Sequence, residues 1–263
     1  AVLLQLGLGL IAVSVGFFVS ALVGRWLSWY YFYNKRLQSN LAQVSAVSIS
    51  RLEIFCVLWH NAWRMGLGVF GAFLILRANT LLSSVYLGLA TTAAYALTLQ
   101  VYSALQGMSM VIFNVQQPKL AQCRVSNQRA ELRRVIKIGF SSSLGLFLLG
   151  SIILIFFGRK LIFQIGGQTE LLSQPLLIWL GVVTFLELNH SLAAGVIVTG
   201  NRVPFVKAAL FSGIAIVSMS WCGLNFFHWG VAGLIASQFF VQLAYNNWKW
   251  PWVVYRELYR DDK

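Results

Sequence analysis

Acidic residues are scarce in this chain of 263 residues, which has seven Asp and Glu against 20 Lys and Arg. Charged residues of both signs make up only 10% of the sequence, whereas about 25% is typical of a soluble domain. Hydrophobic residues reach 58%, and the mean hydropathy is +0.72. These proportions exclude an ordinary soluble domain and predict an all-α membrane protein that crosses the bilayer several times.

The excess of basic residues gives a net charge of +13, which in a soluble chain would favour nucleic acid as a partner. Here the basic residues lie between apolar segments, where they orient the helices in the membrane. We therefore expect no nucleic-acid partner, and we expect contact with anionic membrane lipids as a consequence of the charge.

Cysteine is also rare, and the motifs of common catalytic chemistry are missing. Cys56, Cys123 and Cys222 have no close spacing, which argues against a disulfide framework or a metal site and favours small apolar packing residues. The sequence contains no phosphate loop, zinc pattern, nucleophile elbow or pair of acids in a polar context. We expect no catalytic residues, metal or cofactor, and no enzyme activity.

Long apolar segments dominate what is present, and seven of them have about the 20 residues that a spanning helix needs. They cover residues 2–23, 65–86, 92–113, 138–157, 176–198, 206–226 and 231–248. Pro118 is expected to end the third segment. The expected organisation is a transmembrane helix at 1–24, a cytoplasmic amphipathic or loop segment at 25–58, a six-helix transmembrane lobe at 59–250 and a cytoplasmic tail at 251–263.

Basic residues alternate between the two sides of these spans. One side has only Arg159 and Lys160. The other side has Arg25, Lys35, Arg36, Arg51, Arg64, Lys119, Arg124, Arg129, Arg133, Arg134, Lys137, Arg202, Lys207, Lys249, Arg256, Arg260 and Lys263. The positive-inside rule then places the C-terminus in the cytoplasm and Ala1 on the far side. Because no signal peptide is visible, we expect helices to be missing upstream, and five missing spans would restore a cytoplasmic start.

Two charged residues, Arg77 and Glu187, fall near the middle of predicted spans. Arg77, in the stretch LILRANT, lies about 18 Å from the cytoplasmic end of its span, and Glu187 also lies near the middle of its own. His190 follows Glu187 by one helical turn on the same face. We expect an Arg77–Glu187 ion pair with His190 close by. Such a cluster either fixes the helix packing or lines a transport cavity.

The third span has a polar stripe, because Tyr95, Thr98, Tyr102, Gln106 and Ser109 recur at spacings of three or four residues. Lipid would not solvate this face, so we expect it to point at other helices or at water. Two interpretations remain open. The stripe makes hydrogen bonds between helices, or it presents amide and tyrosine groups to sugar hydroxyls.

Several motifs in residues 59–250 resemble a known transporter family in their order and spacing. They are the entry WHNAWR, the insert RANT, the segment AAYALTLQ, a proline followed by the basic ELRR, and then GRKLIFQIGG and VTGNRVPF. This pattern is similar to bacterial polysaccharide-biosynthesis transporters, the flippases of lipid-linked oligosaccharide of the O-antigen type. Their superfamily also contains the multidrug and toxin extrusion transporters and the lipid II flippase.

The resemblance implies a fold of two six-helix lobes around a central cavity that opens to each side in turn. This chain would supply helix six and the second lobe, and the missing N-terminal lobe, in the same or another chain, is an expected partner. The implied substrate is undecaprenyl-pyrophosphate-linked oligosaccharide in the bacterial inner (plasma) membrane. Arg77 and Arg64 are the expected phosphate contacts, and the other expected cavity-lining residues are Glu187, His190, Tyr95, Tyr102 and Gln106.

Two alternatives differ in function. A multidrug exporter lobe of the same superfamily would favour carboxylates for cation coupling, yet Glu187 is the only acid in a predicted span. A non-transporting fragment would act as a scaffold for glycan assembly, with a glycan polymerase and other assembly proteins as partners. The excess of cations and the polar third helix favour an anionic glycolipid.

Overall fold

The computed structural model describes residues 9–32, 50–164, 169–200 and 202–259. These residues form helices and contain no strand, which confirms the predicted all-α helical bundle. The chain divides into two compact units, Ala1–Val57 and Leu58–Lys263.

The first unit contains helix α2 (Gly9–Phe32) and the beginning of α4 (Arg51–Tyr86). Helix α2 continues beyond the first predicted span, through a basic and aromatic stretch in which Trp26 and Tyr30 stack with ring centroids 5.8 Å apart. The first eight residues of the chain and residues 33–49, part of the predicted amphipathic segment, lie outside the described residues.

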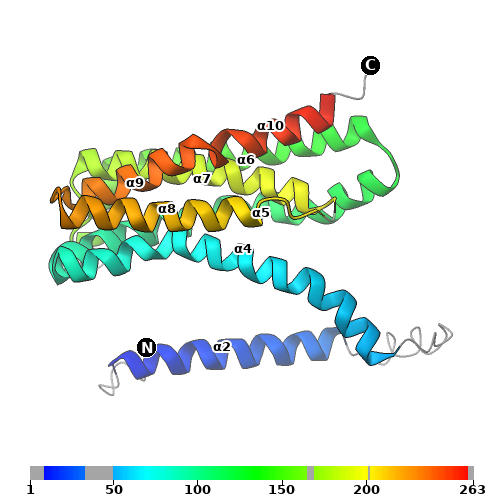
Figure 1. Cartoon of the computed structure of the whole chain (residues 1–263), viewed down its shortest axis with the longest axis horizontal. Helices are drawn as coiled ribbons and strands as arrows, with labels where there is room; N and C mark the ends of the chain where they lie inside the picture. The colour runs from blue at the N-terminus through cyan, green and yellow to red at the C-terminus, as the bar shows by residue number, and fades with distance from the viewer. Residues whose placement is uncertain (1–8, 33–49, 165–168, 201, 260–263) are drawn as a thin grey trace. The chain divides into compact units, whose positions relative to one another are not determined.

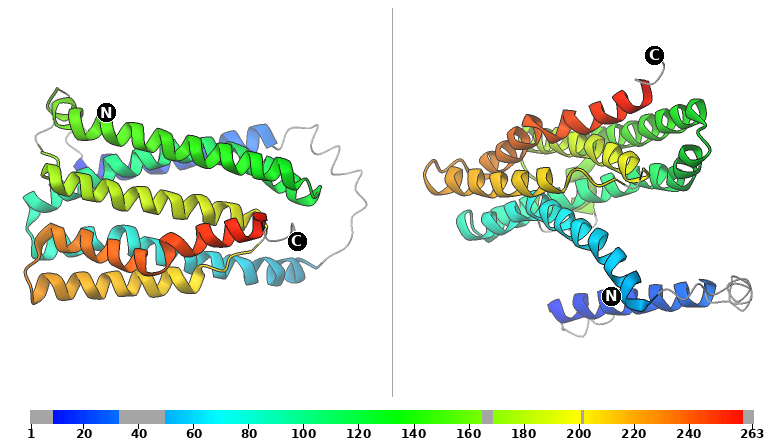
Figure 2. Two further views of the ribbon diagram at one scale, coloured as in Figure 1. Left: turned by 90° about the horizontal axis from the view of Figure 1, so that it is seen from above. Right: turned by 45° about the vertical axis from the view of Figure 1, so that its right-hand side comes forward.

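The second unit is the helical bundle that Figures 1 and 2 show from three directions. It contains the remainder of α4, then α5 (Leu89–Val125), α6 (Arg129–Gln164), α7 (Gln174–Val198), α8 (Val206–Asn225), α9 (Gly230–Ala244) and α10 (Asn246–Tyr259). Among the described residues, five helices are long and apolar enough to cross a membrane: Ala62–Tyr86 of α4, and α5, α6, α7 and α8. They contain the second to sixth predicted spans.

The seventh predicted span is divided, because α9 ends at Ala244 and α10 begins at Asn246. Tyr245 between them has φ −143° and ψ −59°, outside the helical region. Asn246 and Asn247 follow at once, and asparagine has a low intrinsic preference for the helix interior. Helix α9 alone spans about 22 Å, less than the ~30 Å of a bilayer core. Helix α10 includes residues 251–259, which were expected to be a tail.

Helices α5 and α6 are longer than a bilayer requires, with 37 and 36 residues. The expectation that Pro118 ends the third span is wrong, since α5 continues through it to Val125. A proline removes one backbone hydrogen bond and bends a helix, but neighbouring packing can carry the helix onward. Just after the end of α5, Asn127 adopts φ 53°, and the chain turns there into α6.

Helix α7 lies at the centre of this bundle and contacts α5, α6, α9 and α10. One contact shows why α7 has a glycine where it packs against α5. The ring of Tyr102 from α5 lies against Gly181, where a Cβ atom would be 2.5 Å from the tyrosine oxygen. The Tyr102 hydroxyl donates a hydrogen bond to the carbonyl of Leu177 at 3.0 Å. The ring also stacks on Phe147 of α6 at 6.2 Å.

Helix α4 crosses α8 through small residues. A Cβ atom on Gly71 would lie 2.7 Å from the backbone carbon of Ala209, and one on Gly213 would lie 2.7 Å from Leu74 Cβ. Close backbone approach through glycine is typical of helix pairs in membranes. The crossing positions the C-terminal half of α4, where Arg77 lies, relative to the other helices of the bundle.

Candidate functional site

Arg77 lies on α4 with an exposed side chain, while the next two residues face the bundle. Ala78 is 7% exposed and Asn79 is 1% exposed. The Asn79 amide donates a hydrogen bond to the carbonyl of Leu234 in α9 at 3.0 Å, and its oxygen accepts one from Ser220 in α8 at 2.8 Å. These contacts fix the rotation of α4, so Arg77 is held on the outer side.

A groove of about 550 Å³ contains this side chain, and we refer to it as the Arg77 groove. It is lined by Phe73, Arg77, Thr80 and Leu81 of α4 and by Ala96, Leu99 and Gln100 of α5. The polar lining consists of a guanidinium, a hydroxyl and an amide. The Thr80 hydroxyl oxygen is buried and has no hydrogen-bond partner among the residues that the structure describes. The groove therefore combines hydrogen-bonding groups with an apolar wall.

The Arg77 groove lies deep along the two helices. Arg77 is about 14 Å from Tyr86 at the end of α4, and Gln100 is about 16 Å from Leu89 at the beginning of α5. A two-residue turn joins these ends, so both polar residues lie at similar depth. About half of a ~30 Å bilayer core separates them from that end of the bundle.

The predicted Arg77–Glu187 ion pair is wrong, since no ion pair among the described residues joins them. Glu187 is 8% exposed in the central helix α7, and its Oε2 accepts a hydrogen bond from Gln242 Nε2 at 3.1 Å. Arg77 points outward from α4 on the side opposite Asn79. The two side chains therefore face different surroundings.

Glu187 belongs instead to a buried polar network, which we call the Glu187 network. Beyond Gln242, the Asn246 amide donates to Gln242 Oε1 at 2.7 Å and to Ser212 Oγ at 2.8 Å. Asn246 Oδ1 accepts a hydrogen bond from Trp250 Nε1 at 3.0 Å. The network connects α7, α8, α9 and α10 across the break at Tyr245.

His190 lies at the edge of the same network. Its Nδ1 is 3.3 Å from the backbone oxygen of Asn246, and the ring is half-buried. The structure therefore brings His190 and Glu187 to one region, as expected from their spacing. It does not bring either of them to the Arg77 groove.

The polar stripe of the third span faces other helices. Tyr95, Thr98, Tyr102 and Ser109 are fully buried, and Gln106 is half-buried. Thr98 Oγ1 accepts a hydrogen bond from the backbone N–H of Leu172 at 3.0 Å. Together with the Tyr102 bond to α7, this contact with the segment before α7 favours hydrogen bonding within the bundle over a sugar-binding surface. Gln106 makes no hydrogen bond to a described residue.

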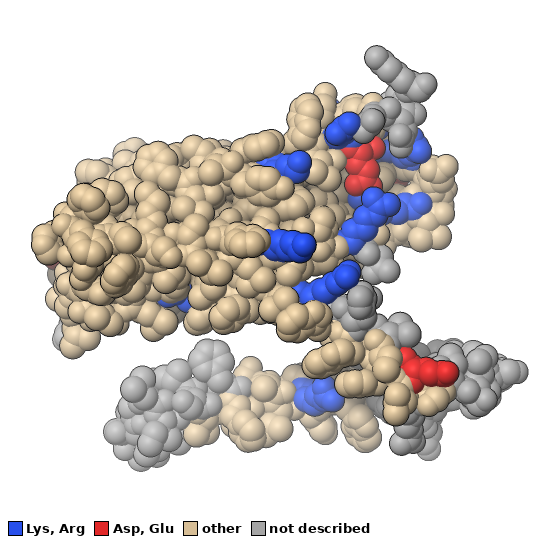
Figure 3. Space-filling model, in the orientation of Figure 1, with Lys and Arg blue, Asp and Glu red and all other residues tan. Residues whose placement is uncertain are grey.

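Arg64 is exposed on α4, about 20 Å along the helix from Arg77. It does not line the Arg77 groove. Arg64 lies nearer than Arg77 to the end of the bundle at which Lys and Arg side chains gather. Figure 3 shows such a group of Lys and Arg side chains on the visible face, near the C-terminal end of α10.

Sequence reasoning treated the cations at this end as orienting charges that also contact anionic lipids, and it missed a cluster of contacts around Arg124. Arg124 pairs with Glu257 of α10, and its guanidinium also donates to Thr199 Oγ1 at 2.9 Å and to the carbonyl of Val196 at 3.0 Å. The pair joins residues 133 positions apart, so no local pattern in the sequence indicates it.

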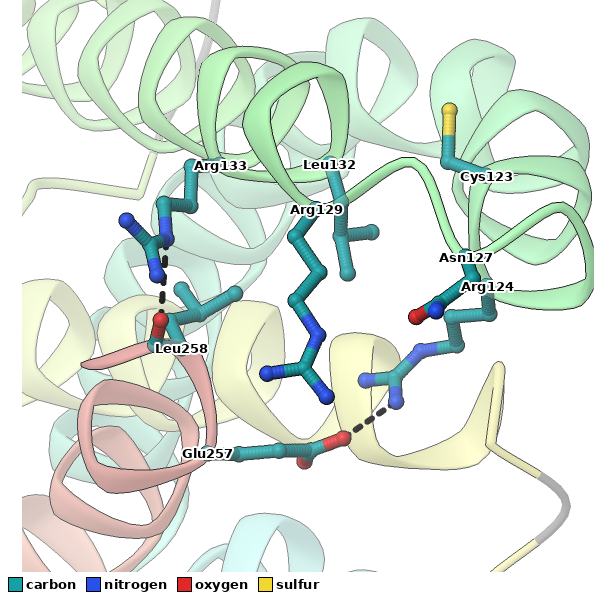
Figure 4. A pocket seen from close by; sticks show the side chains of 8 residues that line it. All are labelled: Cys123, Arg124, Asn127, Arg129, Leu132, Arg133, Glu257 and Leu258. Carbon is teal, nitrogen blue, oxygen red and sulfur yellow. Dashed lines mark hydrogen bonds and ion pairs between the residues drawn. The ribbon is translucent and has the colours of Figure 1, made fainter. Parts of the chain in front are cut away.

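Figure 4 shows the cleft of about 180 Å³ beside this pair, between the α5–α6 turn and α10. On its other side, Arg133 Nε donates to the carbonyl of Leu258 at 2.9 Å, and its guanidinium lies 5.0 Å from the ring centroid of Tyr259. These contacts attach α10 to the ends of α5 and α6.

Metal ligands do not cluster in the described part of the chain, where no three His, Cys, Asp or Glu are grouped. The three cysteines are free: Cys123 is buried, Cys222 is half-buried and Cys56 is exposed. Comparisons of the chain with family models, with curated proteins and with solved structures give no significant match.

Proposed function

We propose that this chain forms one helical lobe of a membrane transporter that flips a lipid-linked oligosaccharide, with the Arg77 groove as part of the substrate path. The observation that carries the proposal is the exposed guanidinium of Arg77 in the middle of a spanning helix, without an ion-pair partner among the described residues. A charge facing lipid there costs at least about 2.5–3.5 kcal/mol. Arg77 is therefore expected to face water, another polypeptide or an anionic substrate.

The lining of the Arg77 groove fits an amphipathic anionic substrate. A guanidinium binds phosphate oxygens in a bidentate geometry, and the Thr80 hydroxyl and Gln100 amide supply further hydrogen bonds. Phe73 and Leu99 provide an apolar surface beside them. A lipid pyrophosphate with attached sugars combines both kinds of chemistry, and undecaprenyl pyrophosphate is the class that we propose.

The arrangement of the bundle supports a lobe that moves as one body. Helix α7 packs against four other helices, and the Glu187 network connects α7 to α10 through buried hydrogen bonds. Alternating access requires such a lobe to rotate against a second one while the binding residues keep their positions. The second lobe and the glycan-assembly proteins are the proposed partners, and the bacterial inner membrane is the proposed location.

A multidrug exporter lobe is less well supported. Coupling to a cation would call for a carboxylate in the substrate path, and the lining of the Arg77 groove contains none. Glu187, the acid at membrane depth, is buried and bonded to Gln242 instead.

Substitution of Arg77 in the intact protein tests the proposal. Arg77→Ala is expected to reduce surface glycan at least tenfold, because the phosphate contact is lost, while Arg77→Lys keeps partial display. Arg256→Ala, which removes an exposed arginine from α10, is the matched control and should leave display unchanged. Quantitative glycan staining at equal protein level is the measurement, and normal display in Arg77→Ala would reject the role of Arg77.

A further inference from the structure

A second pocket, of about 500 Å³, lies where α10 meets the α7–α8 connection, and we call it the α10 pocket. Its cationic lining comes from three segments that are distant in sequence: Arg124 of α5, Arg202 of the α7–α8 connection and Lys249 of α10. Glu257 is the one acidic residue in the lining. The pocket therefore has more positive than negative groups around one hollow.

The pairing within the α10 pocket leaves two cations for a ligand. Glu257 pairs with Arg124, as Figure 4 shows, and the end of α7 also holds Arg124 in place through Thr199 and Val196. Arg202 and Lys249 form no ion pair with any described carboxylate. Lys249 Nζ lies 6.0 Å from the ring centroid of Tyr245, on the rim of the same pocket. An anion would be held between the Arg202 and Lys249 side chains.

The rest of the α10 pocket is aromatic and apolar. Trp250 lines it and is fixed by its bond to Asn246 and by edge contacts with Phe205 at 5.9 Å and Tyr245 at 6.0 Å. Trp248, on the same short helix, is exposed. Tryptophan and tyrosine prefer the depth of the lipid headgroups, and this preference places the pocket at the membrane–water boundary.

We propose that the α10 pocket binds the phosphate headgroup of an anionic membrane lipid, with Arg202 and Lys249 contacting the phosphate and Trp250 and Tyr245 contacting the beginning of the acyl chains. Basic pockets between membrane helices are known to hold such headgroups. A free phosphate ion would use the cations but not the aromatic wall, so the lining favours the lipid. This proposal does not depend on the proposed transport function.

Lipid titration of the purified full chain in detergent tests this inference. Short-chain phosphatidylglycerol is the probe, with short-chain phosphatidylcholine and inorganic phosphate as parallel arms, and the thermal unfolding midpoint is the measurement. Phosphatidylglycerol is expected to raise the midpoint of the wild type, while the other two ligands raise it much less. An equal rise with phosphatidylcholine or with inorganic phosphate would overturn the assignment to an anionic lipid.

Variants locate the binding in the α10 pocket. Arg202→Ala and Lys249→Ala are each expected to weaken the affinity for phosphatidylglycerol about fivefold, because each removes one cation near the headgroups. Arg202→Glu changes an exposed side chain, so the variant should fold normally. Because the charge at this position is reversed, phosphatidylglycerol should no longer raise its unfolding midpoint. Arg256→Ala removes a cation from the same helix outside the pocket and should respond like the wild type. The assignment of binding to the α10 pocket would be overturned if Arg256→Ala weakened the affinity as much as Arg202→Ala does, or if Arg202→Glu kept the full rise in midpoint.

Discussion

At the scale of single residues, Arg77 and Glu187, the charged residues near the middle of predicted spans, have different surroundings. Glu187 is buried in the central helix and accepts a hydrogen bond from Gln242. Arg77 is exposed in a groove whose lining includes no carboxylate. A buried polar group is stable when it is hydrogen-bonded, whereas an exposed charge at this depth needs a polar environment from elsewhere. Glu187 therefore contributes to the packing of the bundle, and Arg77 is the residue that we propose to contact the substrate.

Asn246 is the residue on which the Glu187 network depends most. Replacement of Asn246 by alanine removes its bonds to Ser212, Gln242 and Trp250. Each buried group left without a partner costs on the order of 1–3 kcal/mol. We expect Asn246→Ala to lower the thermal unfolding midpoint in detergent by several degrees. Asn225→Ala, at the exposed end of α8, should leave it unchanged, and equal midpoints for the two variants would contradict the role of the network.

At the scale of helices, the crossing of α4 and α8 decides which face of α4 remains exposed. Gly71 allows the backbones to approach, and Asn79 bonds to both α8 and α9. Because Arg77 lies on the opposite side from Asn79, the crossing sets the direction in which the guanidinium points. The Arg77 groove thus depends on a contact about two helical turns away.

Gly71→Ala tests this crossing. The added Cβ atom would lie 2.7 Å from the backbone of Ala209, and backbone atoms cannot move away cheaply. We expect a loss of about 1–3 kcal/mol in stability and faster proteolysis of α4. Gly66→Ala is the control on the same helix, because nothing lies within 4 Å of its added atom. If Gly71→Ala is as stable as Gly66→Ala, the close crossing is not required.

At the scale of the whole molecule, hydrophobic segment length was sufficient to predict the helical bundle. The predicted spans between residues 65 and 226 all fall within helices long and apolar enough for a membrane. The prediction that Pro118 ends a helix failed because a local rule was outweighed by packing along α5. The break at Tyr245 was missed because it lies only three residues before the predicted end of the span, and the hydropathy of a segment does not locate a break in the backbone.

The candidate site was predictable in part. The depth of Arg77 follows from counting residues along a helix, since the rise per residue is constant. The ion pair with Glu187 was not predictable, because it depends on which helices are neighbours and on how α4 is rotated. The Arg124–Glu257 pair, between residues far apart in the chain, was missed for the same reason.

The central claim is that the Arg77 groove faces a hydrated path and not lipid, and thiol labelling of the intact protein in membranes tests it most directly. Arg77→Cys would be made in a background without Cys56, Cys123 and Cys222, which are free thiols. The control is Phe156→Cys, at a similar depth on α6 and 72% exposed.

Our account predicts that a water-soluble, membrane-impermeant thiol reagent labels residue 77 at least tenfold faster than residue 156. Equal, slow labelling at both positions would contradict the account, because it would place Arg77 against lipid.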